Sequence, residues 1–166
     1  MRILAVYGNP KSGGFVHNCV DAVAQRLESR GAEVDRLHLA EIEMKDCTGC
    51  FTCLRTGRCT IDDDMAGVIE RIRAADGLVC GVSVRNGLMT ALFKRFYERI
   101  TYTIIFCGDI TDKYVLGISA VGMAGGKAVT RRIVAMSEMG ARTVDHLFFR
   151  TGIPTRISAE DASERL

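Results

Sequence analysis

The stretch "RILAVYGNPKSGGFVHN", residues 2 to 18, runs from an apolar segment through a glycine-rich turn into an amphipathic one. The apolar run 2–8 is continuous, which is typical of a strand buried on both faces of a parallel sheet. From about Val16 to Arg30 apolar residues recur at helical spacing, and Gly31 is a suitable helix stop. The stretch therefore predicts one strand–turn–helix unit of an α/β fold.

The same alternation of strand-like and helix-like segments continues along the chain. We expect strands at 32–39, 77–84, 113–122 and 142–149, and helices at 62–76, 89–104 and 126–141. Asp62 or Asp63 is the expected N-cap of the helix 62–76. Right-handed crossovers between successive strands give a parallel sheet with helices on both faces. The sequence thus predicts an α/β, doubly wound, five-stranded parallel sheet of order 2-1-3-4-5, with a cysteine-rich loop after strand 2 at about 43–61.

Length and composition indicate an ordinary globular protein. The 166 residues are most simply one domain, 1–166, with a polar C-terminal tail at about 150–166. The net charge of +2 gives no reason to expect nucleic acid or a membrane surface as a partner. No apolar run approaches the length of a membrane span, and the first residues lack the features of a secretory signal. We therefore expect a cytoplasmic protein.

Ligands of doubly wound sheets bind outside the carboxyl ends of the strands, at the point where the strand order reverses. The loops after Gly8, Val84 and Val121 lie there in the predicted topology. The first of them contains three glycines, Lys11 and Ser12, so that several N–H groups and a helix N-terminus can face one anion. It matches neither G-x-G-x-x-G nor G-x-x-x-x-G-K-[ST]. A phosphate cradle and an ordinary strand-to-helix turn both fit this loop.

Four of the seven cysteines fall within "CTGCFTCLRTGRC", residues 47 to 59. The spacing C-x2-C-x2-C-x5-C is compact enough for a [4Fe–4S] site on Cys47, Cys50, Cys53 and Cys59. A structural zinc site usually has two separated C-x2-C pairs, and disulfides are disfavoured in a reducing compartment. The remaining thiols, in apolar surroundings, are expected in the core: Cys19, Cys80 and Cys107. We interpret His38 and His146 as structural, His17 as a surface or capping residue of the first loop, and the acidic run 62–64 as helix capping.

Three further segments carry a resemblance to a known family. They are Gly8 to Lys11, "GVSVRNGLMTALFKRFYERI" at 81–100, and "AVGMAGG" at 120–126. In register and residue type they resemble the flavodoxin-like NAD(P)H-dependent FMN reductases, over residues 1 to about 147. The cysteine motif and its continuation "CTIDDDM", 59–65, resemble the iron-sulfur flavoprotein branch of that family.

The resemblance implies an FMN site and a [4Fe–4S] cluster on the four cysteines. The implied FMN-binding residues are Asn9, Pro10, Lys11, Ser12, Gly13, Gly14, Phe15, Val16, Ser83, Val84, Arg85, Asn86, Gly87, Leu88, Gly122 and Gly125. The chain departs from the family at several of these positions, because Phe15 and Val16 replace hydroxyl or amide donors to the phosphate. Arg85 replaces the ring-stacking tyrosine. A guanidinium can stack on a flavin or stabilise a reduced anionic one, so Arg85 is the candidate catalytic residue.

The implied activity is that of an FMN-dependent oxidoreductase. Electrons would pass between NAD(P)H or ferredoxin and a small-molecule or protein acceptor, in a homodimer or homotetramer. Three alternatives stay open at this stage. They are a cluster-free NAD(P)H:FMN or quinone reductase with a vestigial cysteine motif, an FMN-dependent dehydrogenase of a small acidic metabolite, and a cofactor-poor binding protein in which Arg85 and Phe15 displace the flavin.

Overall fold

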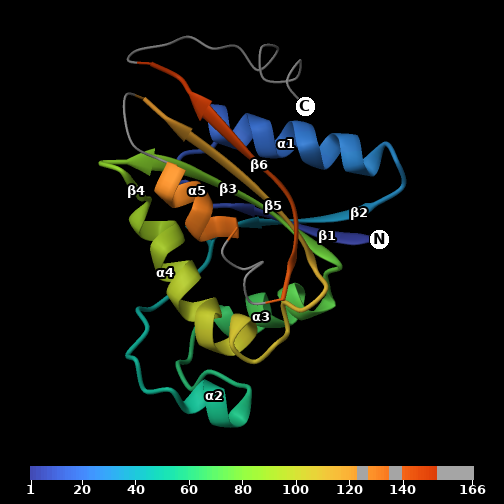
Figure 1. The fold of residues 1–166 in the computed structure, drawn as a ribbon. Coiled ribbons are helices and arrows are strands. Elements are labelled where there is room, and N and C mark those ends of the chain that lie inside the picture. Colours follow the sequence, from blue (N-terminus) through green and yellow to red (C-terminus); the bar gives the residue numbers. More distant parts are fainter. Residues whose placement is uncertain (123–126, 135–139, 153–166) are drawn as a thin grey trace.

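The structure of the chain, a computed structural model, describes residues 1–122, 127–134 and 140–152. Its sheet contains the parallel strands β1 (Arg2–Tyr7), β2 (Glu33–His38), β3 (Gly77–Arg85), β5 (Tyr114–Val121) and β6 (Arg142–Arg150), in the order β2-β1-β3-β5-β6. The short strand β4 (Leu88–Met89) pairs with the end of β3 in the antiparallel sense. Because β4 lies off the main path, the parallel strands follow the predicted order 2-1-3-4-5, which is confirmed (Figure 1).

Helices cover both faces of this sheet. They are α1 (Phe15–Glu28), α3 (Met65–Ala74), α4 (Ala91–Ile100) and α5 (Lys127–Val134), and a separate short helix α2 (Thr52–Thr56) projects from the main body (Figure 1). One core lies under α1 and contains Ile3, Ala5 and Val20. The other core lies under α3 and α4 and contains Leu4, Val6 and Phe96. Alternate residues of β1 thus point to opposite faces, as a doubly wound sheet requires.

Two glycines allow helices to approach the sheet closely at its carboxyl edge. A Cβ atom on Gly8 would lie 2.4 Å from Phe93 Cδ2 of α4, and one on Gly81 would lie 2.3 Å from Val20 Cγ2 of α1. The two residues are also hydrogen-bonded, since the Gly8 N–H donates to the Gly81 carbonyl at 2.8 Å. Side chains at these positions would therefore displace α1 and α4 from the edge where a ligand is expected.

The structure corrects the predicted helix boundaries in two places. The helix expected at 89–104 begins only after the β4 hairpin, with Thr90 as its N-cap, and ends at Ile100. A π-helical turn, Thr101–Ile105, follows, and its buried residues continue the apolar pattern. Helix α3 has Asp64 as its N-cap, so the expectation of Asp62 or Asp63 was wrong. Asp63 nevertheless accepts a hydrogen bond from the Met65 N–H through Oδ1, at 3.1 Å.

Two expectations about cysteines also change. The cysteine-rich segment is not a loop throughout, because Cys53 lies within helix α2. Cys19 and Cys80 are buried as predicted, whereas Cys107 is exposed. The prediction for Cys107 was wrong because the chain leaves the core directly after the π-helical turn. Gly125 and the tail from residue 153 onward lie outside the described residues. Among the residues that are described, no helix has the length and apolar character needed to cross a membrane.

Candidate functional site

The loops after β1 and β3 are joined at the carboxyl edge of the sheet, where the strand order reverses. The Asn9 side-chain oxygen accepts a hydrogen bond from the Ser83 N–H at 2.9 Å. The buried Thr90 hydroxyl donates to the Gly8 carbonyl at 2.6 Å and accepts from the Phe93 N–H at 3.1 Å. These bonds fix the first loop against the start of α4, so that residues predicted to bind one ligand share one edge.

The N-terminus of α1 opens onto this edge without a capping side chain. Its N-cap, Gly14, has an extended backbone and no side-chain hydrogen bond, and the first turn holds no acidic residue. The preceding Gly13 has a φ of +69°, which favours glycine. A Cβ atom on either glycine would meet nothing within 4 Å. The first N–H groups of the helix carry the positive end of its dipole, and the space beside Gly13 and Gly14 is open, which suits an anion.

The other predicted FMN-binding residues differ in how exposed their side chains are. Lys11, Ser12, Arg85, Asn86 and Leu88 are exposed, whereas Val16 and Val84 are buried in the core. For Val16 and Val84, therefore, only the backbone is placed to reach a ligand. Asn86 and Gly87 have φ angles of 50° and 75°, which turn the chain sharply from β3 into β4. Gly122 directly follows β5, at the carboxyl edge of the same sheet.

A large pocket lies beside this edge, between the β3–β4 hairpin, α4 and α5. Its volume is about 770 Å³, within the usual range for small-molecule sites. Arg85, Lys94 and Arg132 line it together with Glu98, which pairs with Lys94. Its other lining residues are Asn86, Gly87, Leu88, Met89, Ala91, Tyr97, Thr101, Tyr102, Ala128 and Val129. Cations and aromatic rings around one cavity suit an organic anion.

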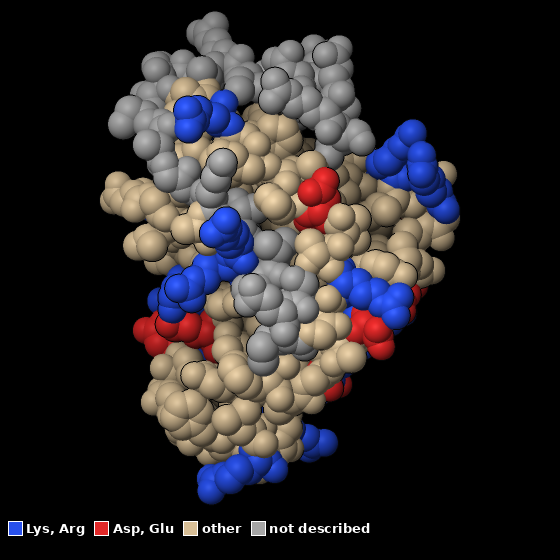
Figure 2. Space-filling view, in the orientation of Figure 1, with Lys and Arg blue, Asp and Glu red and all other residues tan. Residues whose placement is uncertain are grey.

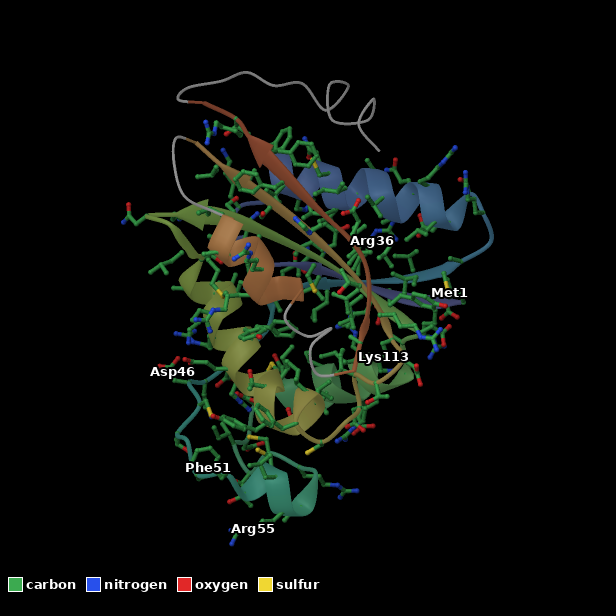
Figure 3. All side chains as sticks on the ribbon, viewed as in Figure 1. Met1, Arg36, Asp46, Phe51, Arg55 and Lys113 are labelled. Carbon is green, nitrogen blue, oxygen red and sulfur yellow. The ribbon has the colours of Figure 1, made fainter. Side chains whose placement is uncertain are left out.

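All four motif cysteines line a second, much smaller pocket of about 20 Å³. Its other lining residues are Thr48, Phe51, Thr60, Ile61, Glu98, Arg99, Tyr102 and Thr103. The structure therefore brings Cys47, Cys50, Cys53 and Cys59 around one space. Within the described residues, no three acidic, cysteine or histidine side chains stand close enough to hold a single metal ion. Figure 3 shows Asp46, Phe51 and Arg55 along this segment, away from the sheet.

The electrostatic surroundings of the motif cysteines differ. Hydrogen bonds from the Thr52 side chain and backbone lower the pKa of Cys50 to about 7. Burial raises the pKa of Cys53, and the neighbouring Cys59 adds to that effect. The Cys59 sulfur accepts a hydrogen bond from Arg99 Nη2 at 3.5 Å. The exposed Cys50 and the partly buried Cys53 thus line the same pocket, beside the Arg99 guanidinium.

Arg99 and its ion pair are a feature that the sequence analysis missed. The Arg99 and Asp63 side chains are each 0% exposed and form a bidentate pair at 2.5 and 3.0 Å. Burial would raise the pKa of Asp63, but hydrogen bonds from Arg99 and from the Lys45 and Met65 N–H groups hold it below its ordinary value. The one signal in the sequence is the position of Arg99 on the apolar face of α4, between the buried Phe96 and Ile100.

A second polar cluster lies at the start of α1. The Tyr7 hydroxyl donates to Asp21 at 2.5 Å, and burial, followed by this carboxylate, raises the pKa of Tyr7. The Tyr7 ring stacks on His38 at 4.1 Å and lies 4.7 Å from the His17 ring. His17 Nδ1 lies 3.1 Å from Asp21 Oδ2 but makes no hydrogen bond there. The spacing of the two histidines gave no sign of this cluster, because it forms only when α1 packs on β1 and β2.

Charged side chains of both signs lie on the one face of the molecule that Figure 2 shows. The basic and acidic side chains are interspersed with uncharged surface. This agrees with the small net charge of +2. A strongly basic face, as a nucleic-acid-binding protein presents, is not seen on this side of the described residues.

The fold and the carboxyl edge define an α/β protein of the flavodoxin-like class. A flavodoxin from the domain Archaea superposes with a TM-score of 0.61 at 14% identity, over 99% of this chain and 92% of that one. The family model for NADPH-dependent FMN reductase matches residues 1–153, and the chain therefore belongs to that family.

Proteins of similar sequence include iron-sulfur flavoproteins. Iron-sulfur flavoproteins from Archaeoglobus fulgidus and Methanosarcina thermophila are each 31% identical to this chain, over 100 and 99 residues. The matches cover 60% of this chain, 46% of the Archaeoglobus protein and 52% of the Methanosarcina protein. The chain thus aligns with about half the length of these relatives.

Proposed function

We propose that this chain is an FMN-dependent oxidoreductase that passes electrons between NAD(P)H or ferredoxin and a small-molecule or protein acceptor. Membership of the FMN reductase family supports FMN as the cofactor. The observation that carries the proposal is the uncapped N-terminus of α1 at the point where the strand order reverses. Bound FMN would accept two electrons, as from a hydride, and release them one at a time.

Different residues at the carboxyl edge would bind the phosphate and the ring of FMN. The backbone N–H groups at Gly13, Gly14 and Phe15 would hold the phosphate, with Lys11 and Ser12 beside them. The segment from Ser83 to Leu88, together with Gly122, would face the ring. Arg85 carries no ion pair within the described residues and is exposed at the mouth of the large pocket. Its guanidinium is therefore free to stack on the ring or to stabilise negative charge there.

The cysteine pocket supports a [4Fe–4S] cluster as a second cofactor, which would carry one electron. Cys47, Cys50, Cys53 and Cys59 would be its ligands. Each ligand of such a cluster binds a different iron, so the four sulfurs stand further apart than around a single ion. The absence of a single-ion site among the described residues is compatible with that spacing. Arg99 Nε, in a residue that lines the pocket, is buried without an acceptor. An N–H group left without a partner suits a sulfide-bearing occupant.

The ligand assignment is tested by replacing single cysteines. Cys53→Ser should lose most of the iron and sulfide from anaerobically prepared protein and keep the FMN. Cys107→Ser is the matched control, because Cys107 is outside the motif although its sulfur lies 3.7 Å from the Cys53 carbonyl oxygen. It should keep both cofactors. Full iron in the Cys53→Ser protein would contradict the assignment. Wild-type protein with FMN but without iron would instead indicate a cluster-free reductase.

The large pocket favours a second candidate function, the oxidation or reduction of a small acidic metabolite. Arg85 and Arg132 contribute cations to the pocket wall without ion-pair partners among the described residues. Arg85→Ala and Arg132→Ala should each raise KM for carboxylate substrates about tenfold, since charged hydrogen bonds contribute about 1.5–3 kcal/mol. Arg131→Ala is the control, because Arg131 does not line the pocket. Unchanged KM values in both pocket variants would exclude this candidate.

The surface around the cysteine pocket supports a homodimer or homotetramer. Phe51, Leu54 and Phe106 are 50%, 44% and 56% exposed. Phe51 and Phe106 both pack against the Tyr102 ring, at centroid distances of 5.0 and 5.5 Å. A group of exposed apolar side chains is typical of an interface, and a second copy of the chain is our proposed occupant. We also propose the cytoplasm as the compartment, where reduced thiols persist.

A further inference from the structure

Arg99 connects helix α4 to the cysteine segment, although it lies 40 residues beyond the last motif cysteine. Its side chain is 0% exposed. A charge at such depth is stable only when it is paired and hydrogen-bonded. Among the described residues, the hydrogen-bond partners of its guanidinium all belong to the stretch from Lys45 to Asp63, which contains the four cysteines. This geometry gives Arg99 a role beyond that of a helix residue packed in the core.

The two ends of the cysteine segment meet at the Arg99 guanidinium. Nη1 donates to the Lys45 carbonyl at 2.8 Å, before the first cysteine, and to the Asp63 carboxylate, after the last one. Asp63 in turn accepts from the Lys45 N–H at 2.8 Å. One residue further out, Asp64 accepts from the Glu43 N–H at 2.7 Å through its side chain. Residues 46–62 are thus closed into a loop whose base is held together by Arg99.

Arg99 also reaches the cysteine pocket itself. Nη2, the nitrogen that bonds Asp63 Oδ1 at 3.0 Å, donates to the Cys59 sulfur at 3.5 Å. Arg99 lines the pocket together with all four cysteines. The Asp63 carboxylate balances the guanidinium charge, so what Cys59 receives is mainly a directed N–H group. A planar guanidinium fork can serve a carboxylate and a sulfur at once, whereas a lysine ammonium cannot span both in this way.

We propose that Arg99 is a positioning residue of the four-cysteine site: it closes the cysteine loop and, through its hydrogen bond to Cys59, raises the reduction potential of the cluster held there. The second half of this proposal rests on the proposed cluster. Hydrogen bonds to cluster sulfurs favour the reduced form, because that form carries one more negative charge. Reduction adds one electron and breaks no bond, and the electron comes from the same donor as in the proposed reaction.

The test compares two variants with a control from the same helix. Arg99→Lys keeps a positive charge but loses the fork. The double variant Arg99→Met with Asp63→Leu removes both charges together, so that no unpaired charge is left in the core. Arg95→Met is the control, because Arg95 also holds the cysteine segment, through Asp46 at 2.6 Å, but is 42% exposed and has no hydrogen bond to a cysteine among the described residues.

The first readout is the midpoint potential of the cluster, followed by electron paramagnetic resonance during redox titration. In Arg99→Lys, the one-electron equilibrium should shift about tenfold toward the oxidised form, which is about 59 mV. Arg95→Met should keep the wild-type potential. The double variant should fold, as judged by circular dichroism, and hold less iron. A wild-type potential in Arg99→Lys together with full iron in the double variant would overturn the proposal.

The second readout does not depend on iron. Hydrogen exchange at the Lys45 and Asp64 amides should be about tenfold faster in Arg99→Lys than in wild type, because these amides lie at the base of the loop. Unchanged exchange would overturn the loop-closing role. If wild-type protein takes up no iron and sulfide, the proposed cluster is excluded, and so is the proposed effect of Arg99 on its reduction potential. Faster exchange in Arg99→Lys would then still support Arg99 as the residue that closes the loop.

Discussion

The side-chain oxygen of Asn9 accepts a hydrogen bond from the Ser83 N–H at 2.9 Å, across 74 positions of the chain. This bond joins the loop after β1 to the end of β3, the two segments that would hold the phosphate and the ring of one flavin. Asn9 therefore acts within the proposed site as a link between its two halves, in addition to any contact with the cofactor.

Asn9→Ala should weaken FMN binding by about tenfold. The Ser83 N–H would lose its partner, which costs about 1–3 kcal/mol for a buried donor and less where water enters. Fluorescence quenching of FMN during titration of the apoprotein measures the affinity. Ser29→Ala is the control, because it removes the hydrogen bond from the Ser29 hydroxyl to the Arg26 carbonyl at the opposite end of α1. The Asn9 link would be unimportant if both variants bound FMN equally well.

Gly14→Asp should change stability and FMN affinity in opposite directions. Gly14 has the extended backbone of an N-cap, so an aspartate there would cap α1 and interact favourably with the helix dipole, by about 0.3–1 kcal/mol. The same carboxylate would repel a phosphate, and affinity for FMN should fall at least tenfold, by about 1.4 kcal/mol. Gly14→Asn supplies the cap without the charge and should retain most of the affinity. If Gly14→Asp and wild type bound FMN with equal affinity, this helix end would be excluded as the phosphate-binding site.

The strand–helix alternation was readable from the sequence because apolar periodicity is a local property. The buried run of β1 and the repeat of α1 are visible within a few residues of each other. The β4 hairpin was missed because it depends on positive φ angles at Asn86 and Gly87, and Asn86 is not a glycine. The end of α4 was misplaced because the π-helical turn Thr101–Ile105 continues the apolar pattern without a break.

The candidate site was predictable to the extent that topology determines it. Parallel strands bring their carboxyl ends to one edge, so the position of Asn9, Ser83 and Gly122 at that edge follows from strand order. The buried pair of Arg99 with Asp63 was not predictable, because its residues are 36 positions apart and each resembles an ordinary surface charge. Capping, which the acidic run 62–64 predicts, accounts for only one of the hydrogen bonds that Asp63 accepts.

Asp63→Asn should destabilise the chain in a pH-dependent way. The pKa of Asp63 in the folded chain lies below its ordinary value of 3.8. Its stabilising contribution is therefore complete above about pH 4 to 5 and is lost as the pH falls through the folded-state value. At pH 6 the variant should lose about 3–5 kcal/mol of unfolding free energy, since it leaves a buried arginine unpaired.

Urea denaturation of the iron-free chain between pH 3 and pH 6 measures this difference. The difference in unfolding free energy between wild type and Asp63→Asn should become smaller toward pH 3. Asp46→Asn is the control, because Asp46 is 80% exposed in its pair with Arg95 and exposed pairs contribute about 0–1 kcal/mol. A constant gap across the whole pH range would contradict the role given to the Asp63 carboxylate.

Phe106→Lys should weaken self-association. Phe106 is 56% exposed and stacks on Tyr102 beside the cysteine pocket, so a charge there would lie within the proposed interface. Light scattering coupled to size-exclusion chromatography should report a smaller mass than for wild type. Val144→Lys is the control, because Val144 is 61% exposed but lies on the edge strand β6. If wild-type protein were monomeric in solution, the proposed interface would be excluded.

The central claim is that one chain holds both a flavin and a four-iron cluster. Its most direct test is the absorption spectrum of anaerobically prepared wild-type protein, together with assays of flavin, iron and inorganic sulfide. We predict about one FMN, four iron and four sulfide per chain, as a single [4Fe–4S] centre beside one flavin requires. Protein that lacks either flavin or iron after reconstitution with an excess of both would contradict the account.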